Sequence, residues 1–180
     1  MQTSLRYNYQ DYLQLPEDKR YEIIDGDLFM VPSPNEGHQR ILSNIFYILS
    51  HYVRQNKLER VYFAPLDVLF SEEDIVQPDI IFVSHENKRI ITKDNIKGIP
   101  DLIIEVLSPS SGNRDIGIKK KLYARNRVRE YWIVDPEHET ADVLLLKGKG
   151  FEGKRYCFKD TICSSVIQDL RIGAKEIFLE

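Results

Sequence analysis

Two carboxylates and one lysine are the residues of this sequence whose types and spacing suggest chemistry. Asp79 follows Pro78 and opens the apolar run 80–83, and Glu105 lies near the end of the apolar run 102–107. Runs of this length, rich in branched residues, are typical of strands that are buried on both faces. A carboxylate within such a strand is costly unless a positive charge meets it.

The two carboxylates are expected to share one face of a sheet. Side chains alternate along a strand, so Asp79 and Glu105 meet at one end of that face if their strands pair. Carboxylates that close repel each other unless a cation neutralises them. We therefore expect Asp79 and Glu105 to hold Mg²⁺, with Mn²⁺ as a substitute, because Mg²⁺ takes one or two carboxylates plus phosphate oxygens and water. The alternative is that Asp79 ends a strand at the surface and that Glu105 pairs with a basic side chain.

The lysine comes from a helix expected from about residue 114 to 126. At about 100° per residue, Lys119 falls inside the apolar arc of this helix, whereas Lys120 and Lys121 fall outside it. The arc is formed by Ile116, Ile118, Leu122 and Tyr123.

Lys119 is therefore expected to face the part of the sheet that carries the Glu105 side chain. An ammonium beside a metal-bound pair of carboxylates orients or deprotonates an attacking water and offsets the charge of the transition state. The alternative is a pair with Asp115, four residues earlier, which contributes only ~0.2–0.5 kcal/mol on an exposed helix.

Positive charge is concentrated in residues 112–129. This segment holds seven Lys or Arg residues and one acid, a net charge of +6, in a chain whose net charge is −3. A solvated face explains such a run about as well as a surface for a polyanion does. On the second interpretation, Arg114, Lys120 and Lys121 are the predicted nucleic-acid contacts.

Length and composition favour one domain spanning residues 1–180, with a sizeable core. Cys157 and Cys163 form no metal-ligand spacing with another Cys or His, so we expect free thiols and a reduced, cytoplasmic setting. The sequence shows no N-terminal signal pattern and no apolar run near the ~20 residues of a membrane helix, so no membrane partner is expected.

Residues 21–31 are expected to form an N-terminal β-hairpin. Two short strand patterns flank Asp25-Gly26, a two-residue turn that requires positive φ. Glu22 shares a face with Ile24, which favours an inward orientation. The pattern alone slightly favours a solvent-facing edge position for Glu22.

A long helix is expected to follow the hairpin. Ser33 is a suitable N-cap and Pro34 a suitable first residue, and the apolar spacing continues to about Gln55. His38 lies in the first turn of this helix. A surface or capping role is common for such a histidine, and a nucleic-acid contact is the site hypothesis.

The order of the remaining elements predicts an α/β fold with a mixed central sheet flanked by helices. The helix after residue 107 is expected to be a crossover between parallel strands. Short strand candidates near the C-terminus predict a further β-hairpin. The expected strands are 61–70 (interrupted by Pro65), 79–83, 101–107, 130–135, 141–146, 156–158 and 165–167.

Taken in order, the motifs of this chain resemble the PD-(D/E)XK nuclease superfamily. The more specific resemblance is to a widespread bacterial family of restriction-endonuclease-like proteins, and it covers nearly the whole chain. The segments that carry it are 11–16, 21–26, 33–34, 38–39, 67–68, 77–79, 105–110 and 130–136, with Asp115, Lys119 and Tyr123.

The resemblance implies Mg²⁺-dependent cleavage of nucleic acid. Asp79 and Glu105 are then the metal ligands, Lys119 the catalytic cation and Glu22 a helper at the metal or water. The superfamily places its lysine two residues after the acid on the same strand, and here that position is Leu107. Lys119 on the following helix is the matching position in this branch.

Three functions are compatible with these residues, and the least favoured of them is a metal-dependent phosphatase acting on a small substrate. The first is a metal-dependent endonuclease acting on nucleic acid, with DNA favoured, as a homodimer because duplex DNA has two-fold symmetry. The second is a module that keeps the fold, has weak or no turnover, and binds nucleic acid or a protein partner. Leu107 and the modest size of the basic segment keep the second open.

Overall fold

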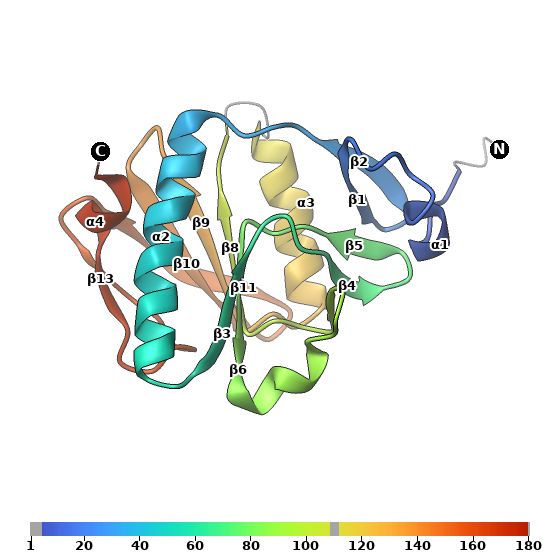
Figure 1. Ribbon diagram of the computed structural model, residues 1–180. Coiled ribbons are helices and arrows are strands. Elements are labelled where there is room, and N and C mark those ends of the chain that lie inside the picture. The colour runs from blue at the N-terminus through green and yellow to red at the C-terminus, as the bar shows by residue number, and fades with distance from the viewer. Residues whose placement is uncertain (1–4, 109–111, 180) are drawn as a thin grey trace.

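The structure is a computed structural model that describes residues 5–108 and 112–179, with side chains in the second range described from residue 116 onward (Figure 1). The helices are α1 (Tyr9–Tyr12), α2 (Glu36–Gln55), the 3-10 helix η1 (His85–Ile90), α3 (Gly112–Arg125) and α4 (Ala174–Phe178). The strands are β1 (Arg20–Ile24), β2 (Asp27–Val31), β3 (Glu59–Phe63), β4 (Val68–Ser71), β5 (Asp74–Val76), β6 (Ile80–Ser84), β7 (Ile96–Lys97), β8 (Leu102–Val106), β9 (Glu130–Asp135), β10 (Thr140–Lys147), β11 (Gly150–Cys157), β12 (Thr161–Cys163) and β13 (Arg171–Gly173).

A six-stranded mixed sheet forms the centre of the described chain. Its strand order is β11-β10-β9-β8-β6-β3. β8 and β9 run parallel and are joined through α3, whereas β6 pairs antiparallel with β8 and with β3. This confirms the expected mixed α/β sheet, with α3 as the crossover between its parallel strands.

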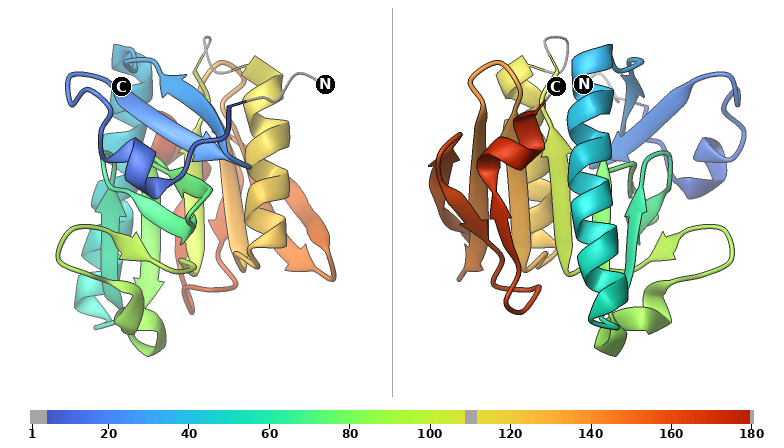
Figure 2. Two further views of the ribbon diagram at one scale, coloured as in Figure 1. Left: turned by 90° about the vertical axis from the view of Figure 1, so that its right-hand side faces the viewer. Right: turned by 60° about the vertical axis from the view of Figure 1, so that its left-hand side comes forward.

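Helices α2 and α3 cover opposite faces of this sheet (Figures 1 and 2). On the α2 side, Ile45 and Leu49 pack in one cluster with sheet residues such as Ile104. On the α3 side, Leu122 packs in a second cluster with sheet residues such as Ile103. The alternating residues of β8 therefore enter two different cores, as expected for a strand buried on both faces.

A second, five-stranded sheet carries the N-terminal hairpin. Its order is β2-β1-β5-β4-β7, and Ile23 of β1 pairs with Ile75 of β5. Arg125 of α3 forms ion pairs with Asp25 in the hairpin turn and with Asp74 of β5. These contacts hold the hairpin beside α3 (Figure 2, left).

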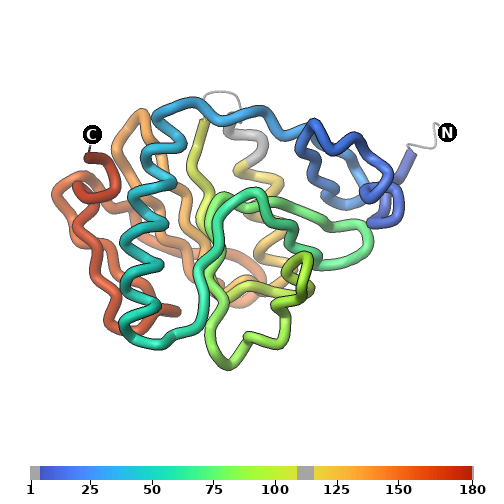
Figure 3. Tube along the Cα trace, viewed as in Figure 1, coloured from blue at the N-terminus to red at the C-terminus, as the bar shows by residue number. Residues whose placement is uncertain are grey.

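The C-terminal region forms two hairpins. β10 pairs with β11 at the edge of the six-stranded sheet, and β12 pairs with β13. Asn44 of α2 donates to the carbonyl oxygen of Ile177 in α4 (3.0 Å), which attaches the chain end to α2. The N-terminal hairpin and α4 consequently lie on opposite flanks of the molecule (Figure 3).

Three element predictions were wrong in detail. α2 begins at Glu36 instead of Pro34, because Asn35 provides the cap by accepting from the His38 N–H (2.9 Å). The run 61–70 is divided at the Pro65 segment into β3 and β4, which belong to different sheets.

The third error concerns the C-terminal strands. Residues 165–167 form no strand, because the Glu130 carboxylate accepts from the backbone N–H groups of Ser165 and Val166. The C-terminal hairpin is formed by β12 and β13, whereas the predicted strand 156–158 coincides with the end of β11, which pairs with β10.

Candidate active site

The register of β6 and β8 places the two predicted carboxylates side by side. Ile80 pairs with Ile104, and one step along this antiparallel register Asp79 stands opposite Glu105. The Asp79 carboxylate also accepts from the backbone N–H of Val106 (2.8 Å). The expectation that these strands pair and bring Asp79 and Glu105 to one end is confirmed.

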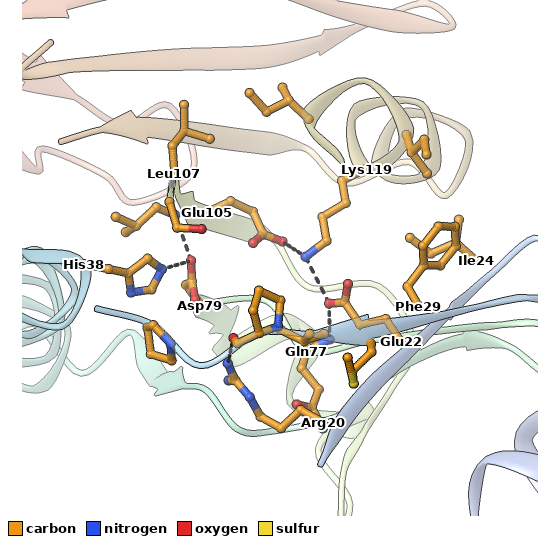
Figure 4. A pocket seen from close by; sticks show the side chains of 18 of the residues that line it. Arg20, Glu22, Ile24, Phe29, His38, Gln77, Asp79, Glu105, Leu107 and Lys119 are labelled. Atoms are coloured by element: carbon orange, nitrogen blue, oxygen red, sulfur yellow. Dashed lines mark hydrogen bonds and ion pairs between the residues drawn. The ribbon is translucent and has the colours of Figure 1, made fainter. Parts of the chain in front are cut away.

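Lys119 connects Glu105 with the N-terminal hairpin. Its Nζ donates to Glu105 Oε1 (3.0 Å) and to Glu22 Oε1 (2.9 Å) (Figure 4). The three side chains are 15% exposed for Lys119, 12% for Glu105 and 6% for Glu22. The helical-wheel prediction that Lys119 faces the sheet is confirmed.

Glu22 is buried, so the slightly favoured prediction of a solvent-facing edge glutamate was wrong. Its carboxylate accepts from the backbone N–H of Gln77 (2.9 Å) as well as from Lys119. The position is not an exposed edge because β1 lies between β2 and β5 in its sheet. The alternation of side chains along β1 could not reveal that β5 pairs with it on its other edge.

His38 and Lys119 lie on opposite sides of Asp79 (Figure 4). The Nε2 atom of His38 is 3.1 Å from Asp79 Oδ2, and the residue is 6% exposed. Burial alone would lower the pKa of His38, but the hydrogen bond to Asp79 and the negative charge of that carboxylate raise it above its ordinary value. The structure thus places His38 against a candidate metal ligand, where it orients Asp79.

Burial and neighbouring charges shift the acid–base properties of the site. Burial, together with the negative charges of Asp79 and Glu22, raises the pKa of Glu105 to about 7, although Lys119 opposes the shift. Burial alone would lower the pKa of Lys119, but the carboxylates of Glu105 and Glu22 raise it above its ordinary value. Lys119 is therefore a cation at neutral pH.

These residues line a cavity of about 520 Å³. Asp79 and His38 lie at one end of the view in Figure 4, Ile24 and Phe29 lie at the other, and Lys119 lies between them. Leu107 also lines the cavity, at the position where the superfamily usually carries its lysine. The Lys119 ammonium, from α3, lies in the same cavity.

The donor set fits a hard divalent cation. The Lys119 ammonium pairs with Glu22 and Glu105, and Asp79, beside Glu105, pairs with His38, so carboxyl groups outnumber ammonium groups at this site. One oxygen of Asp79 and one of Glu105 carry all the hydrogen bonds of those carboxylates in the described chain. Their other oxygens, Oδ1 and Oε2, accept no hydrogen bond from a described residue and suit a metal.

The protein alone provides an incomplete coordination shell. Among the described residues, no group of three or more His, Cys, Asp or Glu side chains could hold one ion. Two carboxylates that leave room for water and phosphate oxygens are the arrangement that Mg²⁺ commonly uses.

Part of the basic segment forms ion pairs with acidic residues, although the Arg125 and Arg129 side chains remain 38% and 58% exposed. Arg125 pairs with Asp25 and Asp74, and Arg129 pairs with Asp101. Of the predicted nucleic-acid contacts, Lys121 is exposed, Lys120 is half-buried, and the side chain of Arg114 lies outside the described part of the chain.

Two contributors to the site were not predicted as site residues. The Tyr123 hydroxyl donates to Glu105 Oε1 (2.5 Å), and the Gln77 backbone holds Glu22. Tyr123 was placed on the inward arc of its helix, four residues from Lys119, so its position was predictable. Its hydrogen bond to Glu105 could not be predicted, because that bond depends on how closely α3 packs against the sheet.

Comparisons with known proteins found one matching family and a similar solved structure. The sequence model of the Uma2 family, described as "Putative restriction endonuclease", matches residues 9–171. The chain belongs to the Uma2 family. The crystal structure of a "putative nuclease" of the DUF820 group from Anabaena variabilis superposes with a TM-score of 0.80 at 21% identity, covering 95% of this chain and 97% of that one.

This similarity confirms the restriction-endonuclease-like fold expected for a Uma2 protein. A search of curated proteins gave no match. In the described part of the chain, no helix is long and apolar enough to cross a membrane.

Proposed function

We propose that this Uma2 protein is a Mg²⁺-dependent nuclease that hydrolyses phosphodiester bonds in nucleic acid, with DNA as the favoured substrate. One observation carries the proposal: Asp79 and Glu105 stand side by side on paired strands, and the Lys119 ammonium lies 3.0 Å from Glu105 in the same cavity. Family membership is consistent with this chemistry. Fold alone does not decide activity, so the proposal depends on the site.

Asp79 and Glu105 would hold the metal through their available oxygens. When bound, Mg²⁺ lowers the pKa of a bound water and polarises the phosphate. The hydrogen bonds from Val106 and His38 keep Asp79 in place, and the Tyr123 hydroxyl does the same for Glu105. These contacts fix both carboxylates before substrate arrives.

Lys119 is positioned to act on the attacking water and on the phosphate. It remains protonated in this setting, so it orients water by donating hydrogen bonds and offsets the negative charge that develops in the transition state. Glu22 holds the ammonium from the hairpin side (2.9 Å). Its role is to position Lys119.

A cleavage assay tests this proposal. Pooled DNA and RNA substrates are incubated with Mg²⁺, with Mn²⁺ or with a chelator. We expect cleavage with either metal, none with the chelator, and a loss of about 10²-fold or more in the Asp79→Asn variant. Metal-independent cleavage, or full activity of Asp79→Asn, would refute the proposal. Substrate binding without cleavage would favour the inactive binding module.

A further inference from the structure

The hairpin β1–β2 does more than supply Glu22, because a whole face of it is turned toward the cavity. Arg20, Glu22 and Ile24 alternate along β1 and share one face. Phe29 stands directly opposite Glu22 in the hairpin register, so its side chain lies on the same face. All four residues line the cavity that contains Asp79 and Glu105.

Phe29 offers an aromatic surface next to the carboxylate and ammonium groups. It is half-buried against the core cluster on the α3 side. In the described chain it forms no pair with another aromatic ring. In Figure 4 it lies with Ile24 at the end of the cavity away from Asp79. A planar apolar group bound there would be next to Lys119.

Arg20 places a positive charge on the same face. Its only hydrogen bond in the described chain is to the backbone carbonyl of Pro32 (3.1 Å), and it forms no ion pair there. This distinguishes it from Arg125 and Arg129, whose charges are matched by aspartates. Arg20 is therefore able to bind a phosphate.

The cavity suits a nucleotide that is not base-paired. Its volume of about 520 Å³ lies within the range of roughly 300–1,000 Å³ typical of pockets that enclose small molecules. A base inside a duplex has both faces covered by its neighbours, so it reaches an aromatic wall only after leaving the stack. A base in a single strand stacks on such a wall without that cost.

We propose that the cavity-facing side of the hairpin binds an unpaired nucleotide next to the scissile phosphate, with Phe29 stacking on the base and Arg20 contacting a backbone phosphate. The inference rests on the proposed function and specifies its substrate: single strands, or unpaired positions within DNA or RNA. Neither residue belongs to the basic segment 112–129.

The test is equilibrium binding of a labelled single-stranded oligonucleotide and of a duplex of the same sequence, in chelator so that Mg²⁺-dependent cleavage does not contribute. We expect tighter binding of the single strand. Phe29→Leu keeps the apolar bulk and loses the ring, so single-strand affinity should fall about 5- to 100-fold. Phe29→Tyr should retain it. Tyr47→Leu, at a residue 70% exposed on α2, is the matched control and should bind like wild type.

Arg20→Gln should weaken binding to all sequences. The plot of log affinity against log salt concentration should become less steep, by about the amount expected for the loss of one phosphate contact. Arg171→Gln on β13 removes the same charge from an exposed position and should leave the slope unchanged. Circular dichroism and thermal melting verify that each variant is folded.

Equal or tighter binding of the duplex, or wild-type binding by Phe29→Leu, would overturn the inference. These outcomes are separable from a failure of the proposed function. If wild type cleaves duplex with Mg²⁺ and shows no strand preference, the nuclease assignment stands and the unpaired-nucleotide site is refuted. If Phe29-dependent single-strand binding occurs without cleavage under any metal, the binding site stands and the nuclease assignment is refuted.

Discussion

Glu105 occupies a strand position that the core would otherwise fill with an apolar side chain. It is tolerated because Lys119 and Tyr123 both donate to its Oε1. Burial nevertheless raises the pKa of this carboxyl to about 7, with Asp79 and Glu22 adding to the shift. The ionised form that a metal requires is therefore costly to the metal-free protein, as is common where function and stability compete.

The stability of the metal-free protein should reflect this cost. The folded-state pKa of Glu105 lies above its ordinary value of 4.5, so the contribution of this group to stability is full below about pH 4.5 and is lost as the pH rises to about 7. Glu105→Gln keeps the shape and the acceptor without ionising. We expect it to melt at a higher temperature than wild type near pH 8, measured by calorimetry in chelator.

Near pH 4 the two proteins should melt at closely similar temperatures, because Glu105 is then protonated in the folded and unfolded states. Glu152→Gln on β11 serves as the control, because it removes an exposed carboxylate far from the site in sequence. Its melting temperature should stay close to that of wild type at both pH values. A wild-type protein that is more stable than Glu105→Gln at pH 8 would contradict the pKa shift.

Metal affinity should depend on pH through the same group. A ligand must release its proton before it binds a metal. With the pKa of Glu105 at about 7, we expect the affinity for Mg²⁺ or Mn²⁺ to fall about tenfold per pH unit below neutrality and to level off above it. Titration calorimetry between about pH 5.5 and 8.5 measures this. An affinity that is flat across that range would contradict metal binding by a Glu105 carboxylate with this raised pKa.

At the scale of the elements, the first turn of α2 positions Asp79 indirectly. Asn35 caps this turn at the N–H of His38, and His38 contacts Asp79. Loss of such a cap typically costs ~0.5–2 kcal/mol. We expect Asn35→Ala to lower the melting temperature by a few degrees and to weaken metal binding, and Asn35→Ser, which retains a cap, to do neither. Unchanged metal affinity in Asn35→Ala would show that the helix cap does not influence the metal site.

Much of the fold and part of the site followed from local sequence patterns. Period-2 alternation gave the shared face of Asp79 and Glu105, and the helical wheel distinguished Lys119 from Lys121. These predictions succeeded because each depends on one element and its buried face.

The remaining features depend on how elements meet. Glu22 is buried because β5 pairs with β1, which no local pattern encodes. Residues 165–167 form no strand because Glu130, more than thirty residues earlier, binds their backbone. The aspartates that pair with Arg125 and Arg129 likewise come from distant segments, so these ion pairs could not be predicted from the basic segment alone.

At the scale of the whole molecule, the site is assembled from five elements or their ends, β1, α2, β6, β8 and α3. A metal bound by Asp79 and Glu105 in the folded state alone stabilises the entire fold, by about 2.7 kcal/mol at a concentration one hundred times its dissociation constant. We expect saturating Mg²⁺ to raise the melting temperature by roughly 5–10 °C. Asp79→Asn should lose most of this increase, and an equal increase in that variant would place the metal elsewhere.

In the proposed nuclease, the Lys119 ammonium of α3 takes the place of a lysine at Leu107, directly after β8. Single-turnover cleavage with saturating Mg²⁺ tests it most directly, comparing Lys119→Ala with Lys121→Ala, an exposed lysine on the same helix. We predict that Lys119→Ala slows cleavage by about 10²–10³-fold and that Lys121→Ala changes the rate by only a few-fold. Equal effects of the two substitutions, or near-wild-type cleavage by a folded Lys119→Ala protein, would show that Lys119 has no special role in cleavage.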